Sequence, residues 1–160
     1  MNSCSVLFVC LGNICRSPTA HGVFVHKVQL LGLQNCVSTD SAGTAAYHVG
    51  NPPDRRSSSA AAARGYDLSQ LRARQALTED FHHFDYILAM DESNLFDLQQ
   101  IAPSDAKAEL KLFLDYAPNL SITEVPDPYY GGSDGFDQVL DLVEEAADGL
   151  LDVIKLRLGS

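Results

Sequence analysis

The segment from Cys10 to Ser17 contains the residues of this chain that are best suited to chemistry. Arg16 follows Cys10 by six positions, and Ser17-Pro18 is a typical helix start. Backbone N–H groups in a loop before a helix converge on an anion, and the unpaired donors of the helix start strengthen that site. Arg16 adds a planar fork that can hold two oxygens of a phosphoryl group. The sequence therefore predicts a phosphate cradle made by Leu11, Gly12, Asn13, Ile14, Cys15, Arg16 and Ser17.

Cys10 is expected at the centre of this cradle, because it ends an apolar run typical of a buried strand. The donors that bind phosphate also stabilise a thiolate, which is the nucleophilic form of cysteine. A buried cysteine more often acts only as a small hydrophobic residue. Here Arg16, six positions after Cys10, favours a nucleophilic role for Cys10. Ser17 can cap the helix, donate to the thiolate, or do both. Cys15 has two open interpretations, a packing residue against the first helix or a redox partner for Cys10.

The elements that position this loop are short strands alternating with helices. Strands are expected at residues 5–10, 37–42, 86–89 and 110–114. Helices are expected from Ser17 to Gly32, between Asp54 and Gly65, from Asp91 to Ile101, and from Phe136 onward, where apolar and acidic residues alternate at helical spacing. Loops are expected at 43–53 and 127–135. This order predicts a parallel α/β sheet with helices on both faces, whose ligands bind beyond the carboxyl ends of the strands.

Composition narrows the class of protein further. The chain has 160 residues, of which 46% are hydrophobic and 20% charged, as in an ordinary globular protein, and we expect one domain over residues 1–160. With 11 Lys and Arg against 21 Asp and Glu, the net charge of −10 disfavours nucleic acid and anionic lipid as partners. No apolar run approaches the roughly 18 residues of a membrane helix, and the N-terminus lacks the basic region of a signal peptide.

The cysteines and histidines indicate a reducing compartment and no metal. All four cysteines, Cys4, Cys10, Cys15 and Cys36, lie in the first quarter of the chain and are interpreted as free thiols. We therefore expect a cytoplasmic protein. No C-x2-C pair or metal-binding histidine spacing occurs, so neither a metal nor another cofactor is expected.

The motifs taken together resemble those of the low-molecular-weight protein tyrosine phosphatases. That family carries C-x5-R-[ST] near its N-terminus and D-P-Y near its C-terminus, as do Cys10 to Ser17 and the segment from Asp127 here. Further matches are the segments 41–43 (Ser-Ala-Gly), 50–54 (Gly-Asn-Pro-Pro-Asp) and 84–91 (Phe-Asp-Tyr-Ile-Leu-Ala-Met-Asp). The resemblance spans essentially the whole chain. It implies a single three-layer domain with a four-stranded parallel sheet.

The resemblance also implies catalytic roles. Cys10 attacks phosphorus and becomes a phosphocysteine, and Arg16 with the loop amides stabilises the transferring phosphoryl group. Asp127 protonates the leaving phenolate and then deprotonates the attacking water. Without Cys10, an aspartate before a proline would be read as a turn residue.

Other residues are expected around these three. Asn13 is predicted to take a left-handed conformation with its side chain tied to Ser41, and Ser17 and Ser41 support the loop from behind. Asp91 is expected to cap a helix, with a contact near the loop left open. The resemblance implies that Tyr47, Tyr129 and Tyr130 hold a phosphotyrosine ring, and the alternative for each is a loop aromatic that packs on the body of the protein.

The chain departs from the family at two positions that bear on the site. Many members have a histidine that braces the Asn–Ser network, and here its place is taken by Gln70, so the brace is either Gln70 or absent. Relatives that act on phosphoarginine tend to carry a threonine where this chain has Ile14. The apolar Ile14 suits an aromatic ring and favours phosphotyrosine.

Two other functions compete with this interpretation. An arsenate reductase on the same fold needs further cysteines, and none follows Cys36. A non-catalytic phosphoanion-binding module would be expected to lack Cys10, Arg16 or Asp127, and all three are present. We therefore expect phosphotyrosine proteins as partners and, apart from weak self-association, a monomer.

Overall fold

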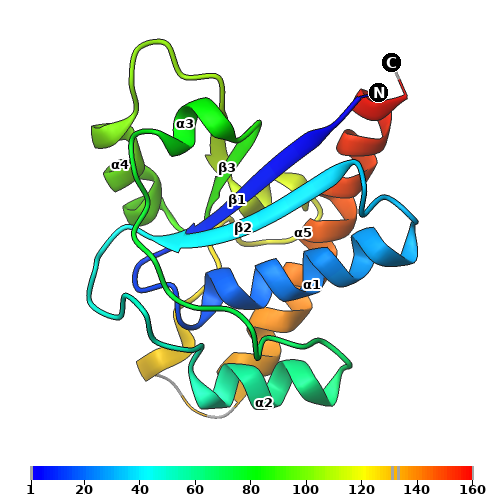
Figure 1. Ribbon diagram of the computed structural model, residues 1–160. Helices are drawn as coiled ribbons and strands as arrows, with labels where there is room; N and C mark the ends of the chain where they lie inside the picture. Colours follow the sequence, from blue (N-terminus) through cyan, green and yellow to red (C-terminus); the bar gives the residue numbers. More distant parts are fainter. Residues whose placement is uncertain (1, 131, 133, 160) are drawn as a thin grey trace.

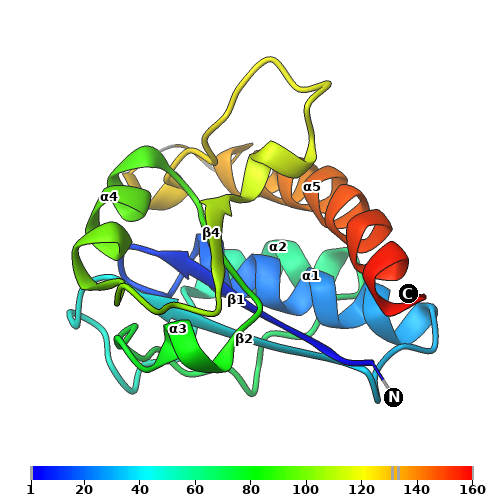
Figure 2. The same ribbon diagram turned by 90° about the horizontal axis from the view of Figure 1, so that it is seen from above.

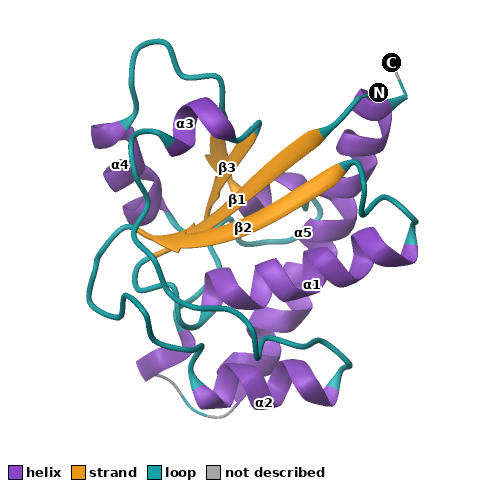
Figure 3. Cartoon of the chain, viewed as in Figure 1, coloured by secondary structure: helices purple, strands orange, loops and turns teal. Residues whose placement is uncertain are grey.

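The four strands form one parallel sheet with the order β2-β1-β3-β4. The computed structural model describes residues 2–130, 132 and 134–159, with the side chain of Tyr130 also outside the described part. The strands are β1 (Cys4–Cys10), β2 (Val37–Gly43), β3 (Tyr86–Ala89) and β4 (Glu109–Leu112) (Figure 3). The central strands β1 and β3 run parallel, so their carboxyl ends lie at the same edge of the sheet. At this edge Cys10, the last residue of β1, lies beside Gly43 of β2.

Helices cover both faces of the sheet, as expected. The helices are α1 (Arg16–Leu30), α2 (Arg55–Ala63), α3 (Asp80–His83), α4 (Glu92–Ile101) and α5 (Asp134–Leu158), and two 3-10 turns are η1 (Phe113–Tyr116) and η2 (Pro128–Tyr130). In Figure 1, α1, α2 and α5 lie together on one side of the sheet, and α3 and α4 lie on the other. The result is a three-layer α/β/α arrangement of the predicted class.

β1 alternates between the two layers of the core. Val6 and Phe8 face the cluster built with α1 and α5, whereas Leu7 and Val9 face the cluster built with α3 and α4. All four side chains are fully buried, as expected for a strand covered on both sides. The start of β1 is further tied to the start of β3 by the Asp85 carboxylate, which accepts from the Ser5 amide at 2.9 Å.

The long helix α5 confirms the amphipathic pattern of the C-terminal segment. Its buried face consists of the predicted apolar positions Val139, Leu140, Val143, Ala147, Leu150, Leu151 and Ile154. Acidic side chains such as Asp137, Asp141 and Asp152 are exposed on the opposite face. In Figure 2 the end of α5 lies close to the N-terminus, and Asn2 donates to the Leu158 carbonyl at 3.1 Å. None of the helices in the described part is long and apolar enough to cross a membrane.

Local predictions were correct for α2 and α4 and wrong in two other places. Asp54 and Asp91 act as N-caps, each accepting a backbone N–H at 2.8 Å. The fourth strand was expected to reach Leu114, but Phe113 and Leu114 turn away into η1 and remain buried against other elements. The predicted cap of α1 was also wrong, because Cys15 occupies the N-cap without a side-chain cap and Ser17 lies inside the helix.

Candidate active site

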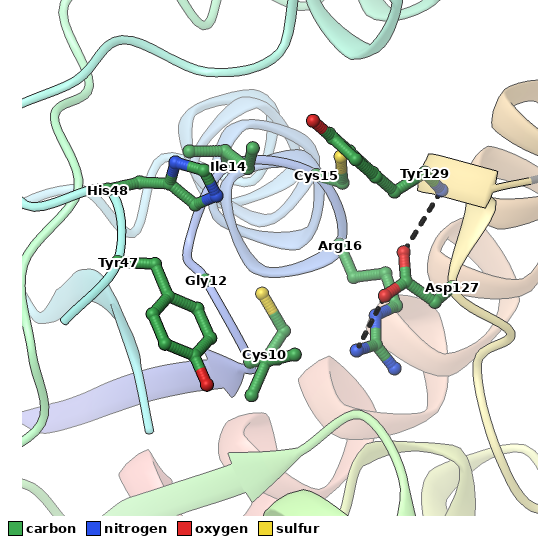
Figure 4. A pocket seen from close by; sticks show the side chains of 10 residues that line it. Cys10, Gly12, Ile14, Cys15, Arg16, Tyr47, His48, Asp127 and Tyr129 are labelled. Atoms are coloured by element: carbon green, nitrogen blue, oxygen red, sulfur yellow. Dashed lines mark hydrogen bonds and ion pairs between the residues drawn. The ribbon is translucent and has the colours of Figure 1, made fainter. Parts of the chain in front are cut away.

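A cavity of about 300 Å³ opens at the carboxyl end of β1. Its lining comes from the loop after β1, the loop after β2 and the segment before η2. The lining residues are Cys10, Leu11, Gly12, Ile14, Cys15, Arg16, Tyr47, His48, Asp127 and Tyr129. Figure 4 shows that Cys10, Arg16 and Asp127 converge, although Asp127 lies 117 positions after Cys10 in the chain. Cys10, Arg16 and Asp127 are thus brought together where the fold class places its ligands.

The loop after β1 curls around the sulfur of Cys10. The Asn13 amide donates to Cys10 Sγ at 3.3 Å, and Ser17 Oγ lies 3.0 Å from the same sulfur. Cys10 is buried, so these donors act in surroundings that are poorly screened by water. A close approach fixes the loop against β2, since a Cβ added to Gly43 would lie 2.6 Å from the Leu11 carbonyl oxygen.

Asn13 takes the left-handed conformation that was predicted, with φ of 58°. Its side chain, however, is not tied to Ser41. Asn13 Nδ2 donates to Ser17 Oγ at 2.7 Å, and Asn13 Oδ1 accepts from the Arg74 amide at 3.0 Å. Ser41 Oγ instead lies 3.0 Å from His21 Nδ1. The expected Asn–Ser contact exists, but with a different serine.

Ser17 contacts Cys10 rather than capping α1. Its hydroxyl is fully buried and lies near Cys10 Sγ, Asn13 Nδ2 and the Ala42 carbonyl, the last at 3.3 Å. Because Asn13 donates to the oxygen, the Ser17 proton is left for either the sulfur or the Ala42 carbonyl. Of the two roles considered from the sequence, the contact with Cys10 is the one observed.

Gln70 does not brace the loop, because its side chain is exposed. The partner of Asn13 from that region is the backbone amide of Arg74. The Arg74 side chain is itself anchored between two carboxylates, with Asp40 at 3.1 Å and Asp80 at 3.1 Å. Asn13 is therefore held by a backbone amide, whose residue is fixed by two ion pairs, and not by the Gln70 side chain.

Arg16 is almost completely buried and lies among acceptors. Its NH1 group donates to Asp91 Oδ2 at 2.6 Å and to the Val125 carbonyl at 3.1 Å, and NH2 lies 3.7 Å from Asp127 Oδ2. Burial lowers the pKa of Arg16, but the charges of Cys10, Asp91 and Asp127 raise it more. Asp91 thus serves both as the α4 cap and as a partner of Arg16, the two roles considered for it.

Asp127 faces the cavity from the segment before η2. Asp127 Oδ1 accepts the Tyr129 amide at 3.0 Å, while Oδ2 points toward Arg16 (Figure 4). The preceding Val125 is buried, and its amide donates to the Met90 carbonyl at 2.8 Å. The carboxyl of Asp127 is therefore held across the cavity from the loop around Cys10.

Aromatic side chains form the walls of the cavity. Tyr47 and Tyr129 line it as predicted, and they are 75% and 40% exposed. The predicted Tyr130 side chain lies outside the described residues. His48 lines the wall beside Tyr47 and was not predicted, because a lone histidine in a loop carries no spacing signal. A Cβ on Gly12 would lie 2.9 Å from the His48 ring.

Cys15 lines the cavity but is itself buried. Its burial raises the pKa of the thiol to about 12. The four cysteines are free thiols in this structure. Within residues 2–130, 132 and 134–159, no three His, Cys, Asp or Glu side chains are grouped to hold a metal ion.

A parallel α/β sheet with a Cys-x5-Arg loop and an opposing aspartate defines a class of phosphoryl-transfer proteins. The sequence model of the family described as "Low molecular weight phosphotyrosine protein phosphatase" matches residues 5–158. The chain is 50% identical over 132 residues to a protein of that name from Schizosaccharomyces pombe, covering 82% of this chain and 84% of that protein. The human protein of the same name is 46% identical over 137 residues, covering 84% and 85%. The chain belongs to this family.

Solved structures agree with this assignment. A protein tyrosine phosphatase from Entamoeba histolytica, crystallised with Hepes in the active site, has a TM-score of 0.91 and 42% identity, covering 98% of this chain and 99% of that one. YfkJ from Bacillus subtilis has a TM-score of 0.91 and 37% identity, covering 98% of both chains. These relatives bear out the predicted family and fold class, and the named phosphatases are hydrolases.

Proposed function

We propose that this protein hydrolyses phosphotyrosine and other aryl phosphates through a phosphocysteine on Cys10. The observation that carries the proposal is the convergence of Cys10 Sγ, the Arg16 guanidinium and the Asp127 carboxyl in one cavity. A nucleophile, a cation for the phosphoryl oxygens and an acid for the leaving group are the parts that such a reaction needs.

The first step forms an S–P bond and breaks the P–O bond to tyrosine. The Cys10 thiolate attacks phosphorus opposite the phenolic oxygen, while Arg16 and the loop N–H groups, with Leu11 and Ser17 at their two ends, stabilise the charge on the other three oxygens. Asp127 gives its proton to the departing phenolate oxygen. The phenol then leaves between the aromatic walls.

The second step returns the enzyme to its starting state. The Asp127 carboxylate accepts a proton from a water molecule whose oxygen attacks phosphorus, the S–P bond breaks, and inorganic phosphate leaves. The Cys10 sulfur departs as a thiolate. The Asn13 amide and the Ser17 hydroxyl, at 3.3 and 3.0 Å from the sulfur, are placed to stabilise it.

The aromatic walls favour a phenyl phosphate over an aliphatic one. Tyr47 and Tyr129 line the cavity, and the Ile14 side chain adds apolar surface to it. A ring in this position gains aromatic contact and apolar burial that phosphoserine cannot provide. One structural neighbour at 32% identity and a TM-score of 0.88 is a Drosophila arginine phosphatase, so phosphoarginine is the competing substrate to exclude.

The test measures release of phosphate from p-nitrophenyl phosphate and from peptides bearing phosphotyrosine, phosphoserine or phosphoarginine, in EDTA. Hydrolysis of the two aryl substrates that vanadate blocks and Cys10→Ser abolishes is the expected result. Cys36→Ser is the matched control, since Cys36 is a free thiol that does not line the cavity. Preference for phosphoarginine, or a Cys10→Ser variant retaining more than about a hundredth of the activity, would refute the proposal.

A further inference from the structure

Arg56 lies in the first turn of α2, between the loop around Cys10 and the segment that carries Asp127. The carboxylate of Asp54 holds its guanidinium as a fork, with Nε 3.1 Å from Oδ1 and NH2 3.0 Å from Oδ2. Asp54 also caps α2 by accepting the Arg56 amide at 2.8 Å. The Arg56 side chain is half exposed, yet its position is set by these paired bonds.

Asp54 links Arg56 to the nucleophile loop. The Asp54 amide donates to the Ile14 carbonyl at 2.7 Å, and Ile14 lines the cavity. The hydrogen bond from Arg56 lowers the pKa of Asp54, which keeps this carboxyl charged. The guanidinium of Arg56 is therefore fixed relative to the loop that binds phosphate.

The other side of Arg56 contacts the segment after Asp127. Arg56 NH2 donates to the Tyr129 carbonyl at 3.4 Å, and the guanidinium carbon lies 5.3 Å from the centre of the Tyr129 ring. The same carbon lies 4.7 Å from the centre of the Phe136 ring, which is buried near the start of α5. Both separations are in the range of cation–π attraction.

Asp127 thus lies between two anchored residues. On one side, Val125 is bonded to Met90 and to Arg16. On the other side, Tyr129 is bonded to Arg56, and the Tyr129 amide donates directly to Asp127 Oδ1 at 3.0 Å. Any movement of Tyr129 therefore changes the orientation of the Asp127 carboxyl.

We propose that Arg56 is a positioning residue that fixes the Asp127 carboxyl, through Tyr129, at the distance from Cys10 that leaving-group protonation requires. The inference rests on the proposed function. Arg56 does not line the cavity, and its contacts beyond Asp54 are with Tyr129 and Phe136, which follow Asp127 in the chain. A displacement of about 1 Å in a catalytic group is enough to cost about 100-fold in rate, so the loss of Arg56 should be measurable.

The test compares Arg56→Met with Arg55→Met on two substrates. Arg55 is the preceding residue of α2 and is exposed, so its substitution removes the same charge from the same helix end.

The assay measures kcat/KM for p-nitrophenyl phosphate, whose leaving group needs little protonation, and for phenyl phosphate, whose leaving group needs much. Arg56→Met should lower kcat/KM about 10–100-fold for phenyl phosphate and much less for p-nitrophenyl phosphate. Vanadate inhibition should change less than about 2-fold, because the substitution leaves the backbone bond between Asp54 and Ile14 in place.

A double-mutant cycle separates positioning from a general structural role. In an Asp127→Asn background, Arg56→Met should lower kcat/KM for phenyl phosphate by less than about 2-fold, because the group it positions has been removed. Arg56→Lys keeps the cation over the rings but loses the fork to Asp54, and it should give an intermediate preference for the better leaving group. If Arg56→Met does not fold, the leaving-group preference of Arg56→Lys decides.

Three results would overturn the inference: equal losses on both substrates, additive losses in the Asp127→Asn background, or a matching leaving-group preference in Arg55→Met. Each of these can arise while the wild-type protein remains an active phosphatase. Failure of the proposed function looks different, since the wild-type protein would then hydrolyse neither aryl phosphate.

Discussion

Substitution of Asn13 tests which interactions stabilise the loop around Cys10. Asn13 is buried in a left-handed conformation, donates to Ser17 at 2.7 Å and accepts from Arg74 at 3.0 Å. Asn13→Gly removes both hydrogen bonds but tolerates the conformation. Asn13→Ala removes the same bonds and places alanine in a left-handed conformation that it adopts less readily than asparagine or glycine. Comparison of the two variants therefore separates the contribution of the hydrogen bonds to stability from that of the backbone conformation.

The expected losses of stability follow from these contacts. Two hydrogen bonds at about 1 kcal/mol each give a loss of about 2 kcal/mol in both variants. Alanine adds about 1–2 kcal/mol for the left-handed conformation, and glycine adds about 0.4–1 kcal/mol because it makes the unfolded chain more flexible. The free energy of unfolding should thus fall by about 2.5–3 kcal/mol for Asn13→Gly and by about 3–4 kcal/mol for Asn13→Ala.

Urea unfolding at neutral pH measures these losses, and hydrolysis of p-nitrophenyl phosphate follows the site. Both variants should also lose activity, because the Ser17 hydroxyl loses the donor that helps to direct its proton toward Cys10. A stability of Asn13→Ala equal to or above that of Asn13→Gly would show that the backbone conformation costs nothing here. Losses below about 0.5 kcal/mol in both variants would show that Asn13 does not hold the loop.

Two further predictions concern pH and oxidation. Burial raises the pKa of Asp85, but the Ser5 amide and two cations together hold it below its usual range. Asp85→Asn should therefore lower the free energy of unfolding above a pH of about 4, and urea curves should show this difference disappearing toward pH 2. After peroxide and then a thiol reductant, the wild-type protein should regain more activity than Cys15→Ser. Cys15 must first lose its proton, which its burial disfavours, and its thiolate then attacks the sulfenic acid on Cys10, forming a disulfide and releasing water. Equal recovery would leave Cys15 as a packing residue.

The sequence predicted the sheet well because its strands are short apolar runs between clear turn signals. Tyr86–Ala89 was placed correctly, and Asp54 and Asp91 were identified as helix caps. The end of β4 was missed because Phe113 and Leu114 continue the apolar run while the backbone turns into η1. Apolar residue types indicate burial, and the buried residues continue from Leu112 at the end of β4 into Phe113 and Leu114 of η1, so residue type does not show where the strand ends. The four-residue helix α3 is too short for periodicity to reveal it.

The site was predictable where its residues lie close together in the chain. The spacing of Cys10 and Arg16 indicated the cradle, and the resemblance to the family added Asp127. Partners far along the chain were harder to identify. Arg16 meets Asp91 across 75 positions and Asn13 meets Arg74 across 61, and neither contact leaves a local pattern.

The pairing of Arg16 with two carboxylates has a consequence for association kinetics. Its charge is offset inside the protein, so it contributes little to the long-range field, which follows the net charge of −10. A phosphate dianion therefore approaches against repulsion and is attracted by Arg16 and the loop N–H donors only at short range. Added salt screens that repulsion within about 10 Å at 0.1 M. The encounter rate should consequently rise with ionic strength until the anions of the salt compete for the cavity, opposite to the behaviour of a phosphate-binding protein with a basic surface.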